Sequence, residues 1–142
     1  MGLTQDTSSI TAAAEAHMSS YSAVLTSNDF KTSAERGAKM ATYYLPTISF
    51  FMDGTIMELA GQSNYASLIS GTLDKLEGLP GVKGHRVEAI SENSAIIWLF
   101  LEVNGLETSN VYFFRRMEDT TEGFEGGIFD GETWVLKQLA KQ

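Results

Sequence analysis

Cysteine is absent from this sequence, and proline occurs only twice. A chain without cysteine has no disulfide framework, no thiol nucleophile and no thiolate metal ligand, and it fits a reducing compartment. No stretch approaches the roughly 18 consecutive apolar residues that a membrane helix needs. The first ten residues also lack the basic segment and apolar run of a signal peptide. We therefore expect a cytoplasmic protein.

Basic residues are scarce as well: 10 Lys and Arg stand against 18 Asp and Glu, which gives a formal net charge of −8. Such a surface repels phosphate backbones and anionic lipid, so neither nucleic acid nor a membrane is expected as a partner. The sequence has no serine elbow and no glycine-rich dinucleotide or phosphate fingerprint. No further ligands with metal-like spacing accompany His17 and His85. These absences disfavour a hydrolase, a dehydrogenase and a metal site, and no cofactor is expected.

The remaining composition is that of one globular domain, with 142 residues, 43% of them hydrophobic and 20% charged. Residues 1–9 are small and polar and are expected to form a flexible N-terminus. Residues 10–142 show no linker, repeat or low-complexity segment, so we expect them to form a single domain.

Three helices are predicted before the main run of strands. Apolar residues recur at helical spacing from Ile10 to Leu25, with Ser9 as the cap. A second helix starts at a capping box, Thr32 with Glu35, and Tyr44 lies in its last turn before a proline. The third helix spans residues 63–77, and a short closing helix, residues 132–141, is expected to be capped by Asp130.

The strands are predicted from β-branched and aromatic runs separated by turn residues. A hairpin, residues 48–52 and 56–59, is expected around Asp53-Gly54. Four further strands follow, at residues 85–91, 95–103, 110–117 and 123–129, and the last is weakened by Gly126-Gly127. This order predicts an α+β fold in which one face of a mostly antiparallel sheet lies under the helices.

The predicted strand at residues 95–103 is apolar on both faces. One domain usually buries only one face of an antiparallel sheet. The second apolar face is therefore expected to pack against another subunit, in a homodimer with Trp98 or Phe100 near the centre of the interface.

Several short segments accompany this order of elements: Asp29-Phe30, Leu45-Pro46-Thr47-Ile48, Gly84-His85-Arg86-Val87, and a close from Gly127-Ile128 through Trp134 to Leu139. Together they resemble the nuclear transport factor 2-like superfamily, in particular its SnoaL-like and scytalone-dehydratase-like branch. The resemblance implies a cone-shaped α+β barrel. Three N-terminal helices would pack on a curved mixed, mostly antiparallel sheet with a short C-terminal helix, and would enclose an apolar pocket.

The resemblance also implies site residues. The histidine after the third helix corresponds to His85, and the asparagine of the penultimate strand corresponds to Asn110. The family's first-strand tyrosine corresponds to Met52, and its second histidine corresponds to Leu99. Met52 and Leu99 are therefore expected to line the pocket without taking part in the chemistry. Its tyrosine–aspartate pair falls on Leu25 and Thr26. That family's dehydration is therefore not carried over, and another chemistry in the same cavity stays open.

Reasoning from the residues adds three candidates for ligand binding. Tyr112 shares a strand face with Asn110, His17 lies on the apolar stripe of the first helix, and Tyr44 could reach the mouth of the cavity. His85 shares its strand parity with apolar residues, where an imidazole could move a proton near neutral pH. Each has a structural alternative: a hydrogen-bonded histidine in the core, a core tyrosine, or a cross-strand pair.

Two functions stay open at this stage. The first is a cofactor-independent lyase, isomerase or cyclase that moves a proton on a small, apolar, oxygenated substrate of polyketide or terpenoid type. The second is a non-catalytic homodimer that binds a small molecule or a protein partner. The sequence leaves open whether the protein is an enzyme, with cofactor-independent proton transfer favoured if it is.

Overall fold

The computed structural model describes residues 6–52, 55–76, 78–103 and 105–129. These residues form three helices and six strands, in the order α1 (Ser8–Thr26), α2 (Ser33–Ala41), β1 (Tyr44–Met52), β2 (Thr55–Ala60), α3 (Gln62–Asp74), β3 (Gly81–Ser91), β4 (Ser94–Val103), β5 (Leu106–Arg116) and β6 (Glu122–Phe129).

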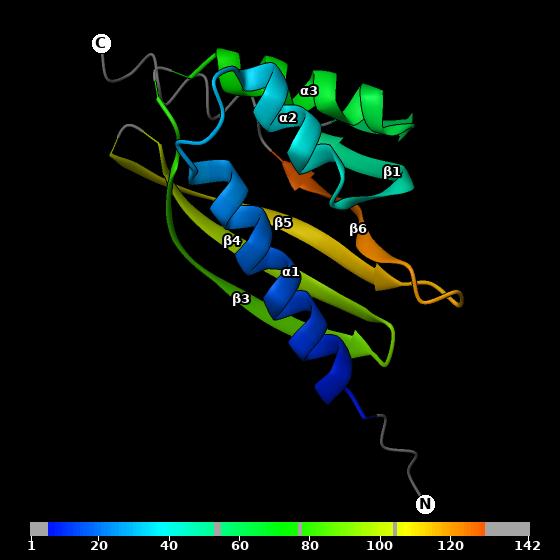
Figure 1. Ribbon diagram of the computed structural model, residues 1–142. Helices are drawn as coiled ribbons and strands as arrows, with labels where there is room; N and C mark the ends of the chain where they lie inside the picture. Colours follow the sequence, from blue (N-terminus) through cyan, green and yellow to red (C-terminus); the bar gives the residue numbers. More distant parts are fainter. Residues whose placement is uncertain (1–5, 53–54, 77, 104, 130–142) are drawn as a thin grey trace, which may run out of the picture.

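The strands make one sheet in the order β2-β1-β6-β5-β4-β3, which the helices cover on one face (Figure 1). Every neighbouring pair is antiparallel except β1 and β6, which run parallel. The α+β class and the mostly antiparallel mixed sheet are thereby confirmed. The Asp53-Gly54 turn, Asp130 and the closing helix lie outside the described residues.

Helix α1 begins two residues earlier than the sequence suggested. Thr7 is its N-cap and makes no side-chain capping bond, whereas Ser9 lies inside the helix, so the prediction of Ser9 as the cap is wrong. Asp6 supports the first turn instead, by accepting hydrogen bonds from the amide and the hydroxyl of Ser8. The apolar stripe of α1 packs on β3 and β4 and is buried, as its spacing predicted (Ile10, Ala14, Met18, Tyr21, Val24 and Leu25).

Helix α2 has the predicted cap but ends earlier than expected. The Thr32 hydroxyl accepts a bond from the amide of Glu35, while the Glu35 carboxylate accepts one from the amide of Lys31. The helix stops at Ala41, and Tyr44 opens strand β1 instead of closing the helix. Aromatic residues favour a pleated, half-buried surface, and Tyr44 pairs there with Phe124 of β6.

Helix α3 also ends before its predicted limit, at Asp74 rather than residue 77. It packs closely on α2 at Gly37, where an added Cβ would lie 2.8 Å from the Ala66 carbonyl oxygen. This close approach fixes the helical layer over the β1–β2 end of the sheet, as Figure 1 shows.

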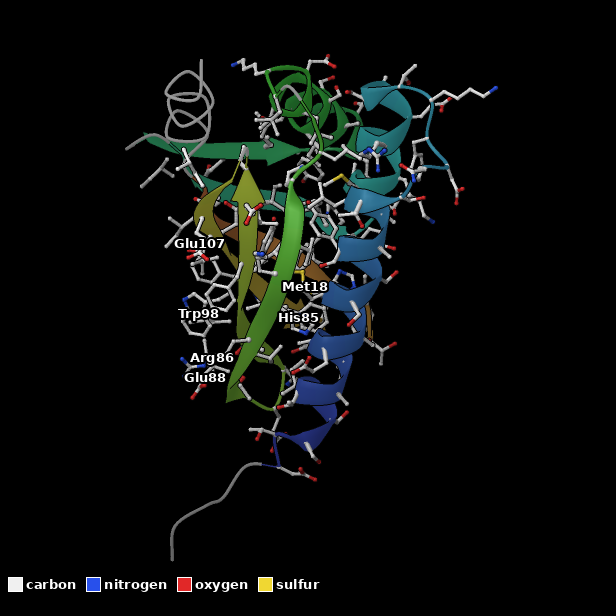
Figure 2. All side chains as sticks on the ribbon, turned by 90° about the vertical axis from the view of Figure 1, so that its left-hand side faces the viewer. Met18, His85, Arg86, Glu88, Trp98 and Glu107 are labelled. Carbon is white, nitrogen blue, oxygen red and sulfur yellow. The ribbon has the colours of Figure 1, made fainter. Side chains whose placement is uncertain are left out.

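The two faces of the sheet differ in character. Toward the helices, alternate residues of β4 and β5 are buried and form the core: Ala95, Ile97, Leu99, Leu101, Val103, Asn110, Tyr112 and Phe114. On the opposite face, a row of aligned residues crosses four strands through Arg86, Trp98, Val111 and Ile128. Figure 2 shows this division, with Trp98 and Arg86 on one side of the sheet and Met18 and His85 on the other.

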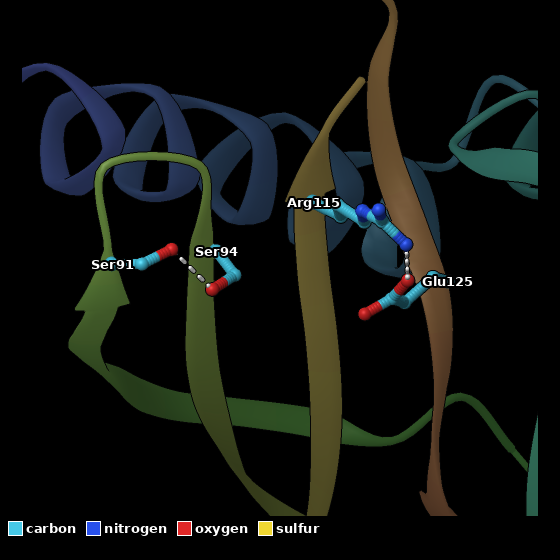
Figure 3. A network of polar contacts seen from close by, with 4 residues as sticks. All are labelled: Ser91, Ser94, Arg115 and Glu125. Carbon is cyan, nitrogen blue, oxygen red and sulfur yellow. Dashed lines mark hydrogen bonds and ion pairs between the residues drawn. The ribbon is translucent and has the colours of Figure 1, made fainter. Parts of the chain in front are cut away.

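Polar contacts join neighbouring strands of the sheet. The Ser91 and Ser94 hydroxyls lie 2.8 Å apart at the β3–β4 turn, and Arg115 on β5 makes a 3.3 Å ion pair with Glu125 on β6 (Figure 3). These contacts are compatible with the register of the β3–β6 meander, which the alternation of buried and exposed residues sets and which decides which residues share the inner face.

Candidate functional site

His85 and Asn110, the two residues that the resemblance made catalytic, lie in one row of the inner face. His85 on β3 pairs with Leu99 on β4, and Leu99 pairs with Asn110 on β5. Two strand spacings separate His85 from Asn110, which places their Cα atoms about 10 Å apart. One small molecule can span that distance.

Asn110 belongs to a buried network of tyrosine hydroxyls. Its Nδ2 donates to the Tyr112 hydroxyl at 3.3 Å. The Tyr21 hydroxyl of α1 bonds the Tyr112 hydroxyl and lies 2.6 Å from the Tyr44 hydroxyl of β1. The network therefore ties helix α1 to strands β1 and β5 at a single point inside the core.

Burial makes these tyrosines harder to ionise than solvated ones. Loss of hydration raises the pKa of Tyr21 and of Tyr44 well above the ordinary value of 10. The same cause raises the pKa of Tyr112 to about 12, although hydrogen bonds from Asn110 and Tyr21 act in the opposite direction. At neutral pH the network therefore offers hydroxyl donors and acceptors without charge.

Asn110 also has an unsatisfied atom. Its side chain is 8% exposed, and its Oδ1 is buried without a hydrogen-bond partner in the described part of the chain. A buried polar atom without a partner is destabilising by about 1–3 kcal/mol, and such groups are rare in folded proteins. The amide is therefore our candidate contact point for a polar ligand group on this face.

Among the described residues, His85 has one hydrogen-bond partner, which lies on helix α1. Its Nε2 lies 2.5 Å from a carboxylate oxygen of Glu15, with 18% of the His85 side chain and 50% of the Glu15 side chain exposed. His85 thus stands between a solvent-facing carboxylate and the buried row that leads to Asn110.

His17 lies elsewhere on the inner face. Its Nε2 is 2.9 Å from the Tyr43 carbonyl oxygen, and its ring packs against Tyr43, Phe114 and Phe124. Burial lowers the pKa of His17, while the bond to Tyr43 and the charge of Glu122 act in the opposite direction. These contacts favour the structural alternative for His17, whose role in ligand binding stays a prediction.

The remaining candidates are Leu99, Tyr44 and Met52. Leu99 is fully buried between His85 and Asn110, and Tyr44 is a core residue within the hydroxyl network. The backbone of Met52 ends strand β1, but its side chain lies outside the described residues.

Two residues of this arrangement were missed by sequence reasoning. Tyr21 was recognised as part of the helical stripe, yet the polar end of a tyrosine on that stripe was a signal that it needs a buried partner. Glu15 gave no such signal, because nothing in the sequence connects it to a histidine 70 residues away.

The described part of the chain offers neither a metal site nor a membrane-spanning helix. It contains no group of three or more acidic, histidine or cysteine residues placed to hold a metal ion. It also contains no helix that is long and apolar enough to cross a membrane.

Comparison with known proteins shows the fold. No protein-family model and no curated protein matches the chain. A domain of unknown function with a cystatin-like fold from Nostoc punctiforme matches with a TM-score of 0.60 and 14% identity, over 96% of this chain and 89% of that one.

Two similar structures carry a functional name. A protein from Shewanella frigidimarina, described as a candidate ketosteroid isomerase, matches with a TM-score of 0.58 and 14% identity, over 82% of this chain and 93% of that one. A second of the same description, from Parabacteroides distasonis, has a TM-score of 0.52 and 13% identity, over 80% and 83% of the two chains. At these identities the likeness shows the fold, and it agrees with the nuclear transport factor 2-like resemblance at that level only.

Proposed function

We propose that this protein binds a small, uncharged, apolar molecule with a ketone or hydroxyl oxygen on the inner face of its sheet, and that it moves a proton on that molecule without a cofactor. The observation that carries the proposal is the buried amide of Asn110 in an otherwise apolar layer: Tyr112 contacts one of its two polar atoms, and the other has no partner among the described residues. The SnoaL-like and isomerase-type assignments both belong to this proposal.

The chemistry follows from the row of His85 and Asn110. His85 takes a proton from a carbon next to the substrate carbonyl, so that negative charge develops on the carbonyl oxygen as an enolate. Rotation of the Asn110 amide by about 180° lets the Tyr112 hydroxyl donate to Oδ1 and turns Nδ2 toward that oxygen. Return of the proton to a different carbon completes an isomerisation, in which no atom is lost and nothing is oxidised.

The surroundings restrict the ligand to neutral molecules. The network tyrosines are uncharged at neutral pH, and burial of a carboxylate beside them without a countercharge is unfavourable. We therefore expect ketones and alcohols to bind more tightly than carboxylic acids of the same skeleton.

A β,γ-unsaturated 3-ketosteroid is a suitable first probe, given the description of two similar structures. Its isomerisation produces a conjugated enone, which is followed by ultraviolet absorbance. We expect turnover that EDTA leaves unchanged, and a loss of about 10²-fold or more in kcat for His85→Ala. Binding of the ketosteroid and of a steroid carboxylic acid is compared by calorimetry in the wild type and in Asn110→Leu.

The outcomes separate catalysis from binding. If the wild type binds the ketone without turning it over, and Asn110→Leu loses that binding, the protein is a binding protein and not an isomerase of this probe. Equal affinity for the ketone in the wild type and in Asn110→Leu would contradict the proposed site. Native mass spectrometry of the purified protein adds an independent test, because it detects any co-purified small molecule.

A non-catalytic homodimer is the second candidate, and it is favoured by the outer face of the sheet. That face carries Phe100 and Ile128 at 41% and 46% exposure beside Trp98. Large exposed apolar side chains grouped on one face are typical of an interaction surface.

A further inference from the structure

The pair formed by Glu15 and His85 joins a helix to the edge strand of the sheet. Glu15 is the only carboxylate in the 19 residues of α1, and it lies against the one histidine of β3. Glu15 and His85 come from segments that the fold alone brings together.

The partner of Nε2 determines the tautomer of His85. A carboxylate has only acceptor atoms, so the ring nitrogen that contacts it must carry the hydrogen. In the neutral imidazole the other nitrogen, Nδ1, then holds the lone pair. Nδ1 makes no hydrogen bond to any described residue, so it is the atom left to accept a proton.

We propose that Glu15 is a positioning residue, which holds His85 as the Nε2–H tautomer and so makes Nδ1 its basic atom. The assignment of Nδ1 as the atom that takes the substrate proton rests on the proposed function, whereas the tautomer does not. A carboxylate that orients a general-base imidazole has the same role in hydrolase triads. The alternative is an ordinary exposed ion pair, which contributes little to stability and nothing to reactivity.

Nuclear magnetic resonance of the ¹⁵N-labelled protein tests the tautomer without any ligand. At mildly alkaline pH we expect the His85 ring to show a protonated Nε2, a lone-pair Nδ1 and an observable Nε2–H proton. Glu15→Ala should shift the nitrogen resonances toward those of a solvated imidazole and remove the Nε2–H signal through fast exchange. Glu15→Gln should restore the wild-type pattern, because its carbonyl oxygen also accepts a hydrogen bond.

Two controls accompany this measurement. His85→Gln identifies which resonances belong to His85. Glu88→Ala removes another carboxylate of the same strand, one that pairs with Arg86, and it should leave the His85 ring resonances unchanged. An Nδ1–H tautomer in the wild type, or an unchanged ring in Glu15→Ala, would overturn the proposal.

Kinetics with the ketosteroid probe then tests the consequence for catalysis. Glu15→Ala should lower kcat by about tenfold or more with little change in KM, and Glu15→Gln should recover part of the loss. An absence of wild-type turnover refutes isomerisation of this probe but leaves the tautomer result standing. The expected tautomer combined with full kcat in Glu15→Ala refutes the positioning role.

Discussion

The amide of Asn110 is a site where stability and binding are expected to oppose each other. Its Oδ1 is buried without a partner, and that arrangement is unfavourable in the folded protein. We expect Asn110→Leu to leave the free energy of unfolding unchanged or to raise it by about 1 kcal/mol, because removal of the unsatisfied Oδ1 offsets the loss of the 3.3 Å bond from Nδ2 to Tyr112. Urea unfolding measures the change. A loss of more than about 2 kcal/mol would show that the amide is fully satisfied in solution.

His17 gives a prediction for the pH dependence of stability. Burial holds its folded-state pKa below the ordinary value of 6.5, so the unfolded chain binds the proton more readily than the folded one. The contribution of neutral His17 is therefore complete above about pH 6.5 and is lost as the pH falls from there toward the folded-state pKa. Urea midpoints between mildly alkaline and mildly acidic pH should decline over this window.

The matched variant for that experiment is His17→Gln, which retains a donor for the Tyr43 carbonyl but does not titrate. It should flatten the decline, whereas His85→Gln should leave the His17 contribution in place. An identical decline in His17→Gln and in the wild type would assign the pH dependence to other groups.

At the scale of elements, Arg36 connects two helices. Its side chain is 5% exposed, and its guanidinium donates to the carbonyls of Val24, Leu25 and Ser27 at the C-terminal end of α1. These carbonyls have no partner within the helix, and a cation is favoured at that end of the helix dipole.

We expect Arg36→Met to lower the free energy of unfolding by about 2–4 kcal/mol, since it removes three charge-assisted bonds and leaves buried carbonyls unsatisfied. Lys39→Met is the control, because Lys39 is an exposed cation of the same helix. Equal stability of the two variants would mean that water replaces the guanidinium.

Gly126 changes the interpretation of the last strand. The sequence suggested that Gly126-Gly127 weakens β6, but a Cβ on Gly126 would collide with the backbone oxygen of Ser49 on the parallel neighbour β1. The glycine is therefore needed for this close approach of backbones.

Two alanine substitutions test the role of Gly126. Gly126→Ala should be destabilising by about 3 kcal/mol or more, because the backbone of β1 must move. Gly71→Ala, on α3 with open space around it, should be stabilising by about 0.5–1 kcal/mol through helix propensity. Thermal unfolding of both variants against the wild type measures these opposite signs, and two variants of equal stability would refute the close approach.

At the scale of the whole molecule, no described helix covers the outer face of the sheet, and we expect a second copy to pack there. Trp98 lies on β4, one strand in from the β3 edge, with the Arg86 guanidinium 5.2 Å from its ring centre, and charged pairs lie on either side of it, on β3 and on β5–β6. Both of these pairs contain an acidic and a basic side chain. In a two-fold dimer the β3 pair of one subunit would face the β5–β6 pair of the other, so that opposite charges can meet. The prediction is a homodimer that Trp98→Glu converts to monomer.

Sedimentation velocity at micromolar concentration decides the subunit count. Leu79→Glu is the control, since Leu79 is 45% exposed in the α3–β3 connection and should leave the dimer intact. A compact wild-type monomer would refute the homodimer.

The sequence by itself determined the classes and order of the described elements and which residues of β3, β4 and β5 share a face. Apolar residues recur about every 3.6 residues in a helix and every 2 in a strand. This spacing involves only near neighbours along the chain, so it can be recognised in the sequence. Ends of elements were less accurate: the sequence kept Tyr44 in a helix, but pairing with Phe124 across the sheet placed it in a strand.

Only the tertiary structure decided which polar side chains meet. The partners Glu15 and His85, the hydroxyls of Tyr21, Tyr44 and Tyr112, and the carbonyls bound by Arg36 come from separate elements. Such contacts depend on strand register and helix packing, which are set by the whole core rather than by local propensity. The sequence could therefore name His85 and Asn110 as candidates, but only the fold placed them in one row and gave each its partner.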